Sequence, residues 1–214
     1  QSYVLDQLVA LTKEEKTEAV IIAGDIYDRG VPPEDAVRLF DDVLCRLVKE
    51  AGQKVILIAG NHDNPSRLGF GQTLLAGENV FITGPLSEAT APIVLQDQYG
   101  PIYLSPFSYG DPFTARTIFQ TESIRSHEDV LRTQINHMLS QIPGKSRSVA
   151  LAHVFLAGAH TSPDSERPLA IGGTTSVPPA LFSPFNYTAL GHLHMHQMWG
   201  NSMAYAGSLM KYSF

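Results

Sequence analysis

The stretch KVILIAGNHD (residues 54–63) places an uninterrupted apolar run in front of a glycine and a polar cluster. A short apolar run that ends in this way is typical of a strand buried on both faces of a sheet. Residues 18–25, EAVIIAGD, follow the same plan. Between these two stretches, residues 32–49 carry apolar side chains at helical spacing. This strand–helix–strand alternation predicts an α/β fold with helices on the faces of the sheet.

The flanking sequence extends this pattern in both directions. Residues 1–16 are expected to form a helix, and residues 91–107 a hairpin with its turn at 97–100. A further amphipathic helix is expected at 124–142, and buried strands at 148–154 and 187–194. The hairpin implies mixed pairing in this half of the chain. We therefore expect a single α/β domain over residues 1–214.

Composition limits the possible functions. With 214 residues, 43% of them apolar, the chain can bury a sizeable core. A net charge of −6 argues against holding nucleic acid by basic residues alone, so phosphate chemistry would depend on bound cations. The lone cysteine, Cys45, excludes an internal disulfide framework and favours a reducing, cytoplasmic setting. No apolar run is long enough to span a membrane.

Polar side chains lie at the ends of four of the expected strands. They are Asp25 and Asp28, then Asn61, His62 and Asp63, then His153, and finally His192 and His194. Ligands collect beyond the carboxyl ends of the strands in open α/β sheets, so these four segments are expected to converge on one pocket. Carboxylate, amide oxygen and imidazole without thiolate suit Mn, Fe, Zn or Mg rather than copper(I) or an iron–sulfur cluster.

The histidines at 192 and 194 raise a narrower possibility. If the strand continues through them, both side chains point to one face and could serve two neighbouring metal ions. A His-x-His pair by itself is equally compatible with a structural or surface role. The ordered combination of Gly24-Asp25-x-x-Asp28, Gly60-Asn61-His62-Asp63, His153 and Gly191-His192-x-His194 is much more specific.

This ordered set resembles the calcineurin-like metallophosphoesterases, and longer stretches resemble the bacterial SbcD-type DNA exonuclease subunits. The stretches are IIAGDIYDRGVPPEDAVRLFDD (21–42), LIAGNHDNPSRLGFG (57–71), SERPLAIGG (165–173), LGHLHMHQ (190–197) and YAGSLMKYSF (205–214). The resemblance implies a four-layer α/β fold with two mixed sheets sandwiched between helices. It also implies two-metal hydrolysis of phosphodiester bonds in DNA, with exonuclease action on duplex ends and endonuclease action on hairpins and single strands.

The same resemblance implies the cofactors and partners. Two divalent metal ions are expected. Manganese is the expected metal, with iron, zinc or magnesium as alternatives, and no organic cofactor is expected. The expected partners are DNA, an SbcC-type SMC-like ATPase and a second copy of the chain in a homodimer, with no membrane. The cellular role would lie in DNA repair, recombination and replication.

Roles for single residues also follow from the resemblance. Asp25 would bridge both metals; Asn61, His153 and His192 would complete one site, and His194 would belong to the other. His62 would face the substrate and stabilise or protonate the leaving group, with Asp63 orienting its ring. Asp28 and His196 would support the ligands from behind.

One departure from the resemblance leaves other functions open. The sequence contains no Asp-x-His motif, which the family carries on a first strand, and it lacks the family's C-terminal capping region. We therefore expect a chain that is truncated or disordered at both ends. Two alternatives follow: a calcineurin-like phosphoesterase for nucleotides or small phosphodiesters, or a catalytically incomplete fragment that binds or dimerises.

Overall fold

The computed structural model describes residues 1–161 and 176–210. Its helices are α1 (Ser2–Glu14), α2 (Glu34–Cys45), α3 (Pro65–Leu68), α4 (Gln72–Ala76), α5 (Pro112–Ile118) and α6 (His127–Leu139). A π-helical segment, Arg46–Glu50, continues α2. The strands are β1 (Ala19–Ile22), β2 (Lys54–Ile58), β3 (Val80–Thr83), β4 (Ile93–Asp97), β5 (Gly100–Phe107), β6 (Arg147–His153), β7 (Phe155–Leu156), β8 (Ser176–Val177), β9 (Tyr187–Gly191), β10 (Gln197–Trp199) and β11 (Met203–Tyr205).

The smaller of the two main sheets contains the stretch from which the fold was predicted. Its order is β1-β2-β3, and both pairings are parallel. Side chains 55–58 of β2 are fully buried, as expected for a strand covered on both faces. The predicted strand–helix–strand unit is confirmed, although β1 and β2 end at Ile22 and Ile58, before the polar clusters begin.

The larger sheet has six strands in the order β10-β11-β9-β6-β5-β4. β4 and β5 form the predicted antiparallel hairpin, and β10 pairs antiparallel with β11. The central pairings β5-β6, β6-β9 and β9-β11 are parallel. This sheet is therefore mixed, as the sequence predicts.

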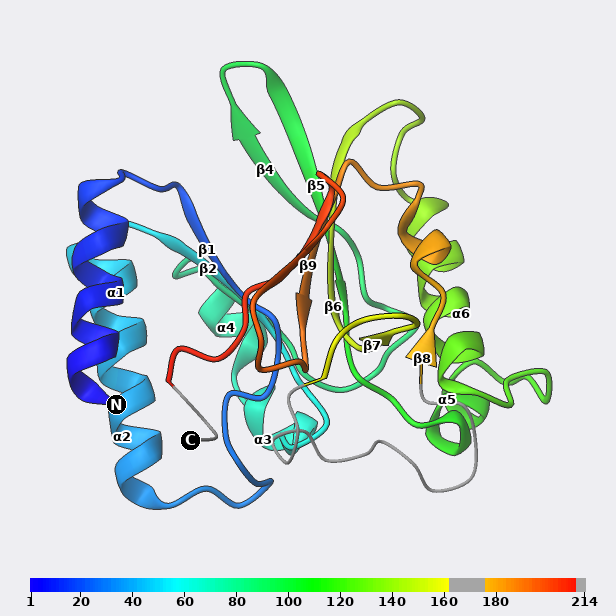
Figure 1. Ribbon diagram of the computed structural model, residues 1–214, viewed down its shortest axis with the longest axis horizontal. Helices are drawn as coiled ribbons and strands as arrows, with labels where there is room; N and C mark the ends of the chain where they lie inside the picture. The colour runs from blue at the N-terminus through cyan, green and yellow to red at the C-terminus, as the bar shows by residue number, and fades with distance from the viewer. Residues whose placement is uncertain (162–175, 211–214) are drawn as a thin grey trace.

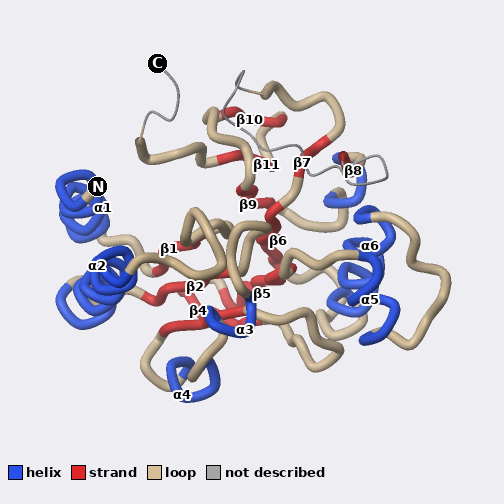
Figure 2. The backbone as a smooth tube through the Cα atoms, turned by 90° about the horizontal axis from the view of Figure 1, so that it is seen from below, coloured by secondary structure: helices blue, strands red, loops and turns tan. Residues whose placement is uncertain are grey.

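The two sheets lie face to face between two layers of helices (Figure 1; Figure 2). Val9 of α1 and Leu47 of the π-helical segment pack on the outer face of β2. Ile56 and Ile58 pack from the inner face against Leu104 and Leu151 of the larger sheet. On the far side, Phe107, Ala150 and Ala152 pack against Leu131, Ile135 and Met138 of α6. Full burial of a Leu or Ile side chain contributes about 1.5–3 kcal/mol. The four-layer α/β fold is confirmed.

Two of the stretches on which the resemblance depends lie wholly or partly outside the described residues. These are residues 165–173 and the last four residues of 205–214. Within the described ranges, none of the helices combines the length and the apolar character needed to cross a membrane.

Candidate metal centre

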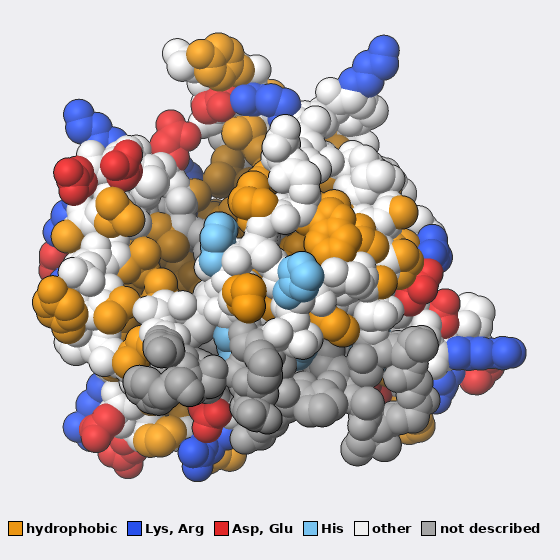
Figure 3. Space-filling view, viewed as in Figure 1, with side chains coloured by type: hydrophobic (Ala, Val, Ile, Leu, Met, Phe, Trp, Pro, Cys, Tyr) orange, Lys and Arg blue, Asp and Glu red, His pale blue; other side chains and the backbone are white. Residues whose placement is uncertain are grey.

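Four strand ends deliver side chains to one place between the two sheets. Asp25 follows β1 and Asn61 follows β2, both in the smaller sheet, while His153 ends β6 and His192 follows β9 in the larger sheet. Histidine side chains come to the surface near the centre of the face drawn in Figure 3. The predicted convergence of four segments is therefore observed.

Two glycines allow these strand ends to approach so closely. A Cβ atom on Gly60 would lie 2.2 Å from Oδ1 of Asp25. A Cβ atom on Gly191 would lie 1.8 Å from the carbonyl oxygen of Ala23. Neither separation is possible for real atoms, so these glycines are needed for close approach and not for their backbone angles.

The side chains of Asp25, His153 and His192 form a cluster that could hold a metal ion. Their possible ligand atoms all lie within 4.8 Å of one another. Nε2 of His153 lies 3.2 Å from Oδ2 of Asp25. Oδ1 of Asn61 lies between the two rings, 2.9 Å from Nε2 of His153 and 3.2 Å from Nδ1 of His192. Asn61 thus joins the cluster as a fourth donor.

Main-chain contacts fix the direction of the cluster's side chains. Nδ1 of His153 donates to the carbonyl oxygen of Ala23 at 2.7 Å, which leaves Nε2 directed at Asp25 and Asn61. Such a contact to the second ring nitrogen is common in metal-binding histidines. Asp25 and His192 have positive φ angles of 49° and 103°. Strained backbone at residues other than glycine is concentrated at functional sites.

The electrostatics of the cluster favour a charged carboxylate. Burial acts to raise the pKa of Asp25, but the hydrogen bond and charge of His153 and the main-chain N–H of His62 outweigh it. The pKa of Asp25 is therefore lowered from its ordinary value. Asp25 is then ionised at neutral pH and able to bind a cation.

This donor set fits a divalent metal ion. One carboxylate, one amide oxygen and two imidazoles converge from four segments, and none of the four donors is a thiolate. Such a combination suits Mn, Fe or Zn. Asp25, Asn61, His153 and His192 would hold the ion.

His62 lies beside the cluster, but the contact that orients its ring differs from the expected one. Its main-chain N–H donates to Oδ1 of Asp25 at 2.9 Å. Nδ1 of the ring lies 2.9 Å from the main-chain carbonyl oxygen of Asp28. The prediction that Asp63 orients this ring is wrong, since the Asp63 carboxylate accepts hydrogen bonds from the N–H groups of Ile26, Tyr27 and Gly60.

The two residues expected to support the ligands have other contacts. The carboxylate of Asp28 is paired with Arg29, and the contact of Asp28 with the His62 ring is made by its main-chain carbonyl. Nδ1 of the exposed His196 lies 2.9 Å from the carbonyl oxygen of Tyr205. His196 therefore anchors its own segment to β11, and this contact does not support a metal ligand.

The expectation for His192 and His194 depended on a strand that ends too early. β9 stops at Gly191, so the alternation of strand faces does not apply to these histidines. Leu193, between them, is buried in the core. His194 is half-buried and lies outside the three-residue cluster. Its role at a second metal ion stays a prediction.

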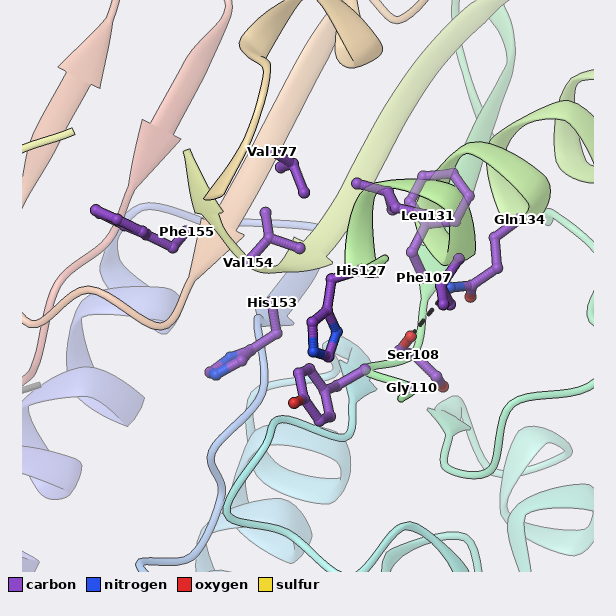
Figure 4. A pocket seen from close by; sticks show the side chains of 12 residues that line it. Phe107, Ser108, Gly110, His127, Leu131, Gln134, His153, Val154, Phe155 and Val177 are labelled. Atoms are coloured by element: carbon purple, nitrogen blue, oxygen red, sulfur yellow. Dashed lines mark hydrogen bonds between the residues drawn. The ribbon is translucent and has the colours of Figure 1, made fainter. Parts of the chain in front are cut away.

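Sequence reasoning missed two aromatic residues near the centre. Tyr109 and His127 line a small pocket together with His153 (Figure 4). Their rings are stacked, with centroids 5.5 Å apart and planes at 25°. No local signal joins these residues, because the contact links the end of β5 to the start of α6.

Comparison with known proteins agrees with the fold and identifies the family. One solved structure aligns with this chain at a TM-score of 0.57 and 13% sequence identity. The alignment covers 95% of this chain and 85% of the chain in that structure, and it supports the fold alone. A dimetal phosphatase from Danio rerio aligns with this chain at 14% sequence identity and a TM-score of 0.46. The alignment covers 95% of this chain and 76% of the phosphatase chain. The family model for calcineurin-like phosphoesterases matches residues 1–196. This match includes all four segments that build the cluster, and the chain belongs to the calcineurin-like phosphoesterase family.

Proposed function

We propose that the protein is a metal-dependent phosphodiesterase and that its substrate is DNA. Family membership implies a hydrolase of phosphoesters. The observation that carries the proposal is the convergence of Asp25, Asn61, His153 and His192 from four strand ends. The choice of DNA is supported by the SbcD-like stretches of the sequence. The same stretches support a homodimer that works with an SMC-like ATPase.

The residues of the centre have separate tasks in this proposal. A divalent ion held by the four donors would polarise a phosphate oxygen and an attacking water. The His153 ring is held in place by Ala23, so its Nε2 stays directed into the centre. His62, whose ring is fixed by the carbonyl of Asp28, is the group that protonates the leaving oxygen.

The role of His62 can be tested by a single substitution. We expect His62→Ala to lower kcat about a hundredfold, as for the loss of a general acid, with Mn²⁺ affinity nearly unchanged. His137→Ala on α6 is the matched control and should keep full activity. The measurement is Mn²⁺-dependent cleavage of linear duplex DNA, with Mn²⁺ binding followed by calorimetry. Unchanged cleavage by His62→Ala would remove His62 from the mechanism.

The choice of substrate is tested with the unaltered protein. Turnover of linear duplex and hairpin DNA is compared with turnover of bis(p-nitrophenyl) phosphate, each with and without Mn²⁺. Metal-dependent cleavage of DNA supports the proposal. Strong turnover of the small ester with none on DNA would assign the protein to small phosphodiesters. Failure to hydrolyse either, together with weak Mn²⁺ binding, would indicate a binding or dimerisation role.

A further inference from the structure

A small pocket opens beside His153, between the end of β5 and the first turn of α6 (Figure 4). Its volume is about 20 Å³, enough for one water-sized group such as a single oxygen. Most of its wall is apolar, formed by residues such as Val154, Phe155 and Leu131. The polar rings that line it are those of His153, His127 and Tyr109. One wall therefore belongs to the metal centre and another to the Tyr109–His127 stack.

Main-chain contacts hold both members of this stack in place. The N–H of Tyr109 donates to the carbonyl oxygen of Ala59 at 3.2 Å, just before the turn that supplies Asn61. His127 is the first residue of α6, directly after the N-cap Ser126, which forms a capping box with Asp129. Tyr109 is thus tied to the β2 end that leads into Asn61, and His127 is fixed at the start of α6. Both residues are held in place before a ligand binds, as expected of a binding group.

The phenol of Tyr109 keeps its proton, and one of the charges that act on it, Asp25, belongs to the centre. Burial raises the pKa of Tyr109 above its ordinary value, and the negative charges of Asp111 and Asp25 add to this effect. Tyr109 is therefore a neutral O–H donor at neutral pH, within electrostatic reach of the carboxylate that would bind the cation.

We propose that Tyr109 contacts the substrate, its hydroxyl donating a hydrogen bond to a phosphate oxygen of the ester held at Asp25, Asn61, His153 and His192. His127 is a positioning residue that fixes the Tyr109 ring by stacking. Hydrogen bonds to charged acceptors are about twice as strong as neutral ones, so this donor favours a phosphate group over a neutral ligand. The inference rests on the proposed function, because it requires a phosphoester at this centre.

Tyr109→Phe removes the hydroxyl and keeps the stack. Inorganic phosphate binding to the Mn²⁺-loaded protein is measured by calorimetry, and kcat/KM is measured on bis(p-nitrophenyl) phosphate. We expect both phosphate affinity and kcat/KM to fall about tenfold, while Mn²⁺ affinity is unchanged. Tyr99→Phe is the matched control, because Tyr99 lies exposed at the hairpin turn and should behave as the unaltered protein.

Two substitutions of His127 separate positioning from general stability. His127→Phe retains a flat ring and should keep phosphate affinity within about twofold. His127→Ala removes the ring and should reproduce most of the loss seen with Tyr109→Phe. A loss of phosphate affinity in His127→Ala that His127→Phe does not restore would overturn the positioning role.

The outcomes also distinguish this inference from the proposed function. If Tyr109→Phe binds phosphate as the unaltered protein does, or loses Mn²⁺, the contact with substrate is refuted. If the unaltered protein binds Mn²⁺ and phosphate but hydrolyses no ester, the proposed function fails, and the comparison of phosphate affinities still decides the role of Tyr109. If it binds no Mn²⁺, both are refuted.

Discussion

Asp63 connects the turns that follow β1 and β2. Its buried carboxylate accepts hydrogen bonds from Ile26, Tyr27 and Gly60 at 3.1, 3.0 and 2.9 Å. Burial raises the pKa of Asp63, and although these three hydrogen bonds lower it, the pKa stays above its ordinary value. The residue thus holds the Asp25 turn against the Asn61 turn, and its task is structural.

Loss of this carboxylate should weaken the fold. Asp63→Ala leaves three partly buried N–H groups without their acceptor, so we expect the free energy of unfolding to fall by about 3 kcal/mol or more. Asp41→Ala, at an exposed site on α2, should change it by less than about 0.5 kcal/mol. Urea denaturation followed by circular dichroism measures both variants. Equal stability of the two would show that the three hydrogen bonds contribute nothing.

The identities of Asp25, Asn61, His153 and His192 could be anticipated because each lies at the end of a recognisable strand. The contacts that hold the residues around them could not be anticipated. The resemblance implies that Asp63 orients the His62 ring, yet the three hydrogen bonds of Asp63 run to main-chain groups, which leave no trace in side-chain patterns. The stacking of Tyr109 on His127 joins residues on different elements, and sequence spacing does not encode it.

At the scale of elements, the centre depends on β9 passing closely under the end of β1. Gly191 ends β9, and the carbonyl of Ala23 occupies the space that a side chain at position 191 would need. The same carbonyl accepts the hydrogen bond from His153. A displacement of the β1 end would therefore disturb two ligands, Asp25 and His153, together.

We expect Gly191→Ala to lower the free energy of unfolding by about 1–3 kcal/mol, the usual range for an added methyl group in a packed site. Mn²⁺ affinity should fall as well, because Ala23 must move. Gly144→Ala is the control, since a Cβ there meets nothing within 4 Å. Calorimetric Mn²⁺ titration and urea denaturation report the two effects. Unaltered Mn²⁺ binding in Gly191→Ala would show that the strand ends can separate without cost to the centre.

Short apolar runs, helical spacing and the hairpin turn predict most of the elements because each pattern is local. The residue at which a strand ends depends also on contacts with distant segments, which local patterns do not report. β9 stops at Gly191, where the carbonyl of Ala23, from a segment distant in sequence, packs against the end of the strand. The prediction that His192 and His194 share one strand face failed for this reason.

The molecule is built around two main sheets, and the candidate centre lies across their boundary. Asp25 and Asn61 follow strands of the sheet β1-β2-β3. In the six-stranded sheet, His153 ends β6 and His192 follows β9. Apart from this cluster, the sheets meet through apolar side chains such as Ile56, Ile58 and Leu151. A metal ion held by all four residues would therefore bind the folded chain and not the unfolded one.

A ligand that binds only the folded state raises stability by mass action. At a free Mn²⁺ concentration one hundred times its Kd, the gain is about 2.7 kcal/mol. For a chain of this length, that gain corresponds to an increase in Tm of about 5–10 °C. Differential scanning calorimetry with Mn²⁺, and again after chelation with EDTA, measures the increase and its reversal. Asn61→Ala and His192→Ala remove one donor from each sheet, and each should abolish most of the increase, whereas His137→Ala should retain it. If His192→Ala kept the full increase while Asn61→Ala lost it, the ion would be held by the smaller sheet alone, and the two sheets would not share a metal centre.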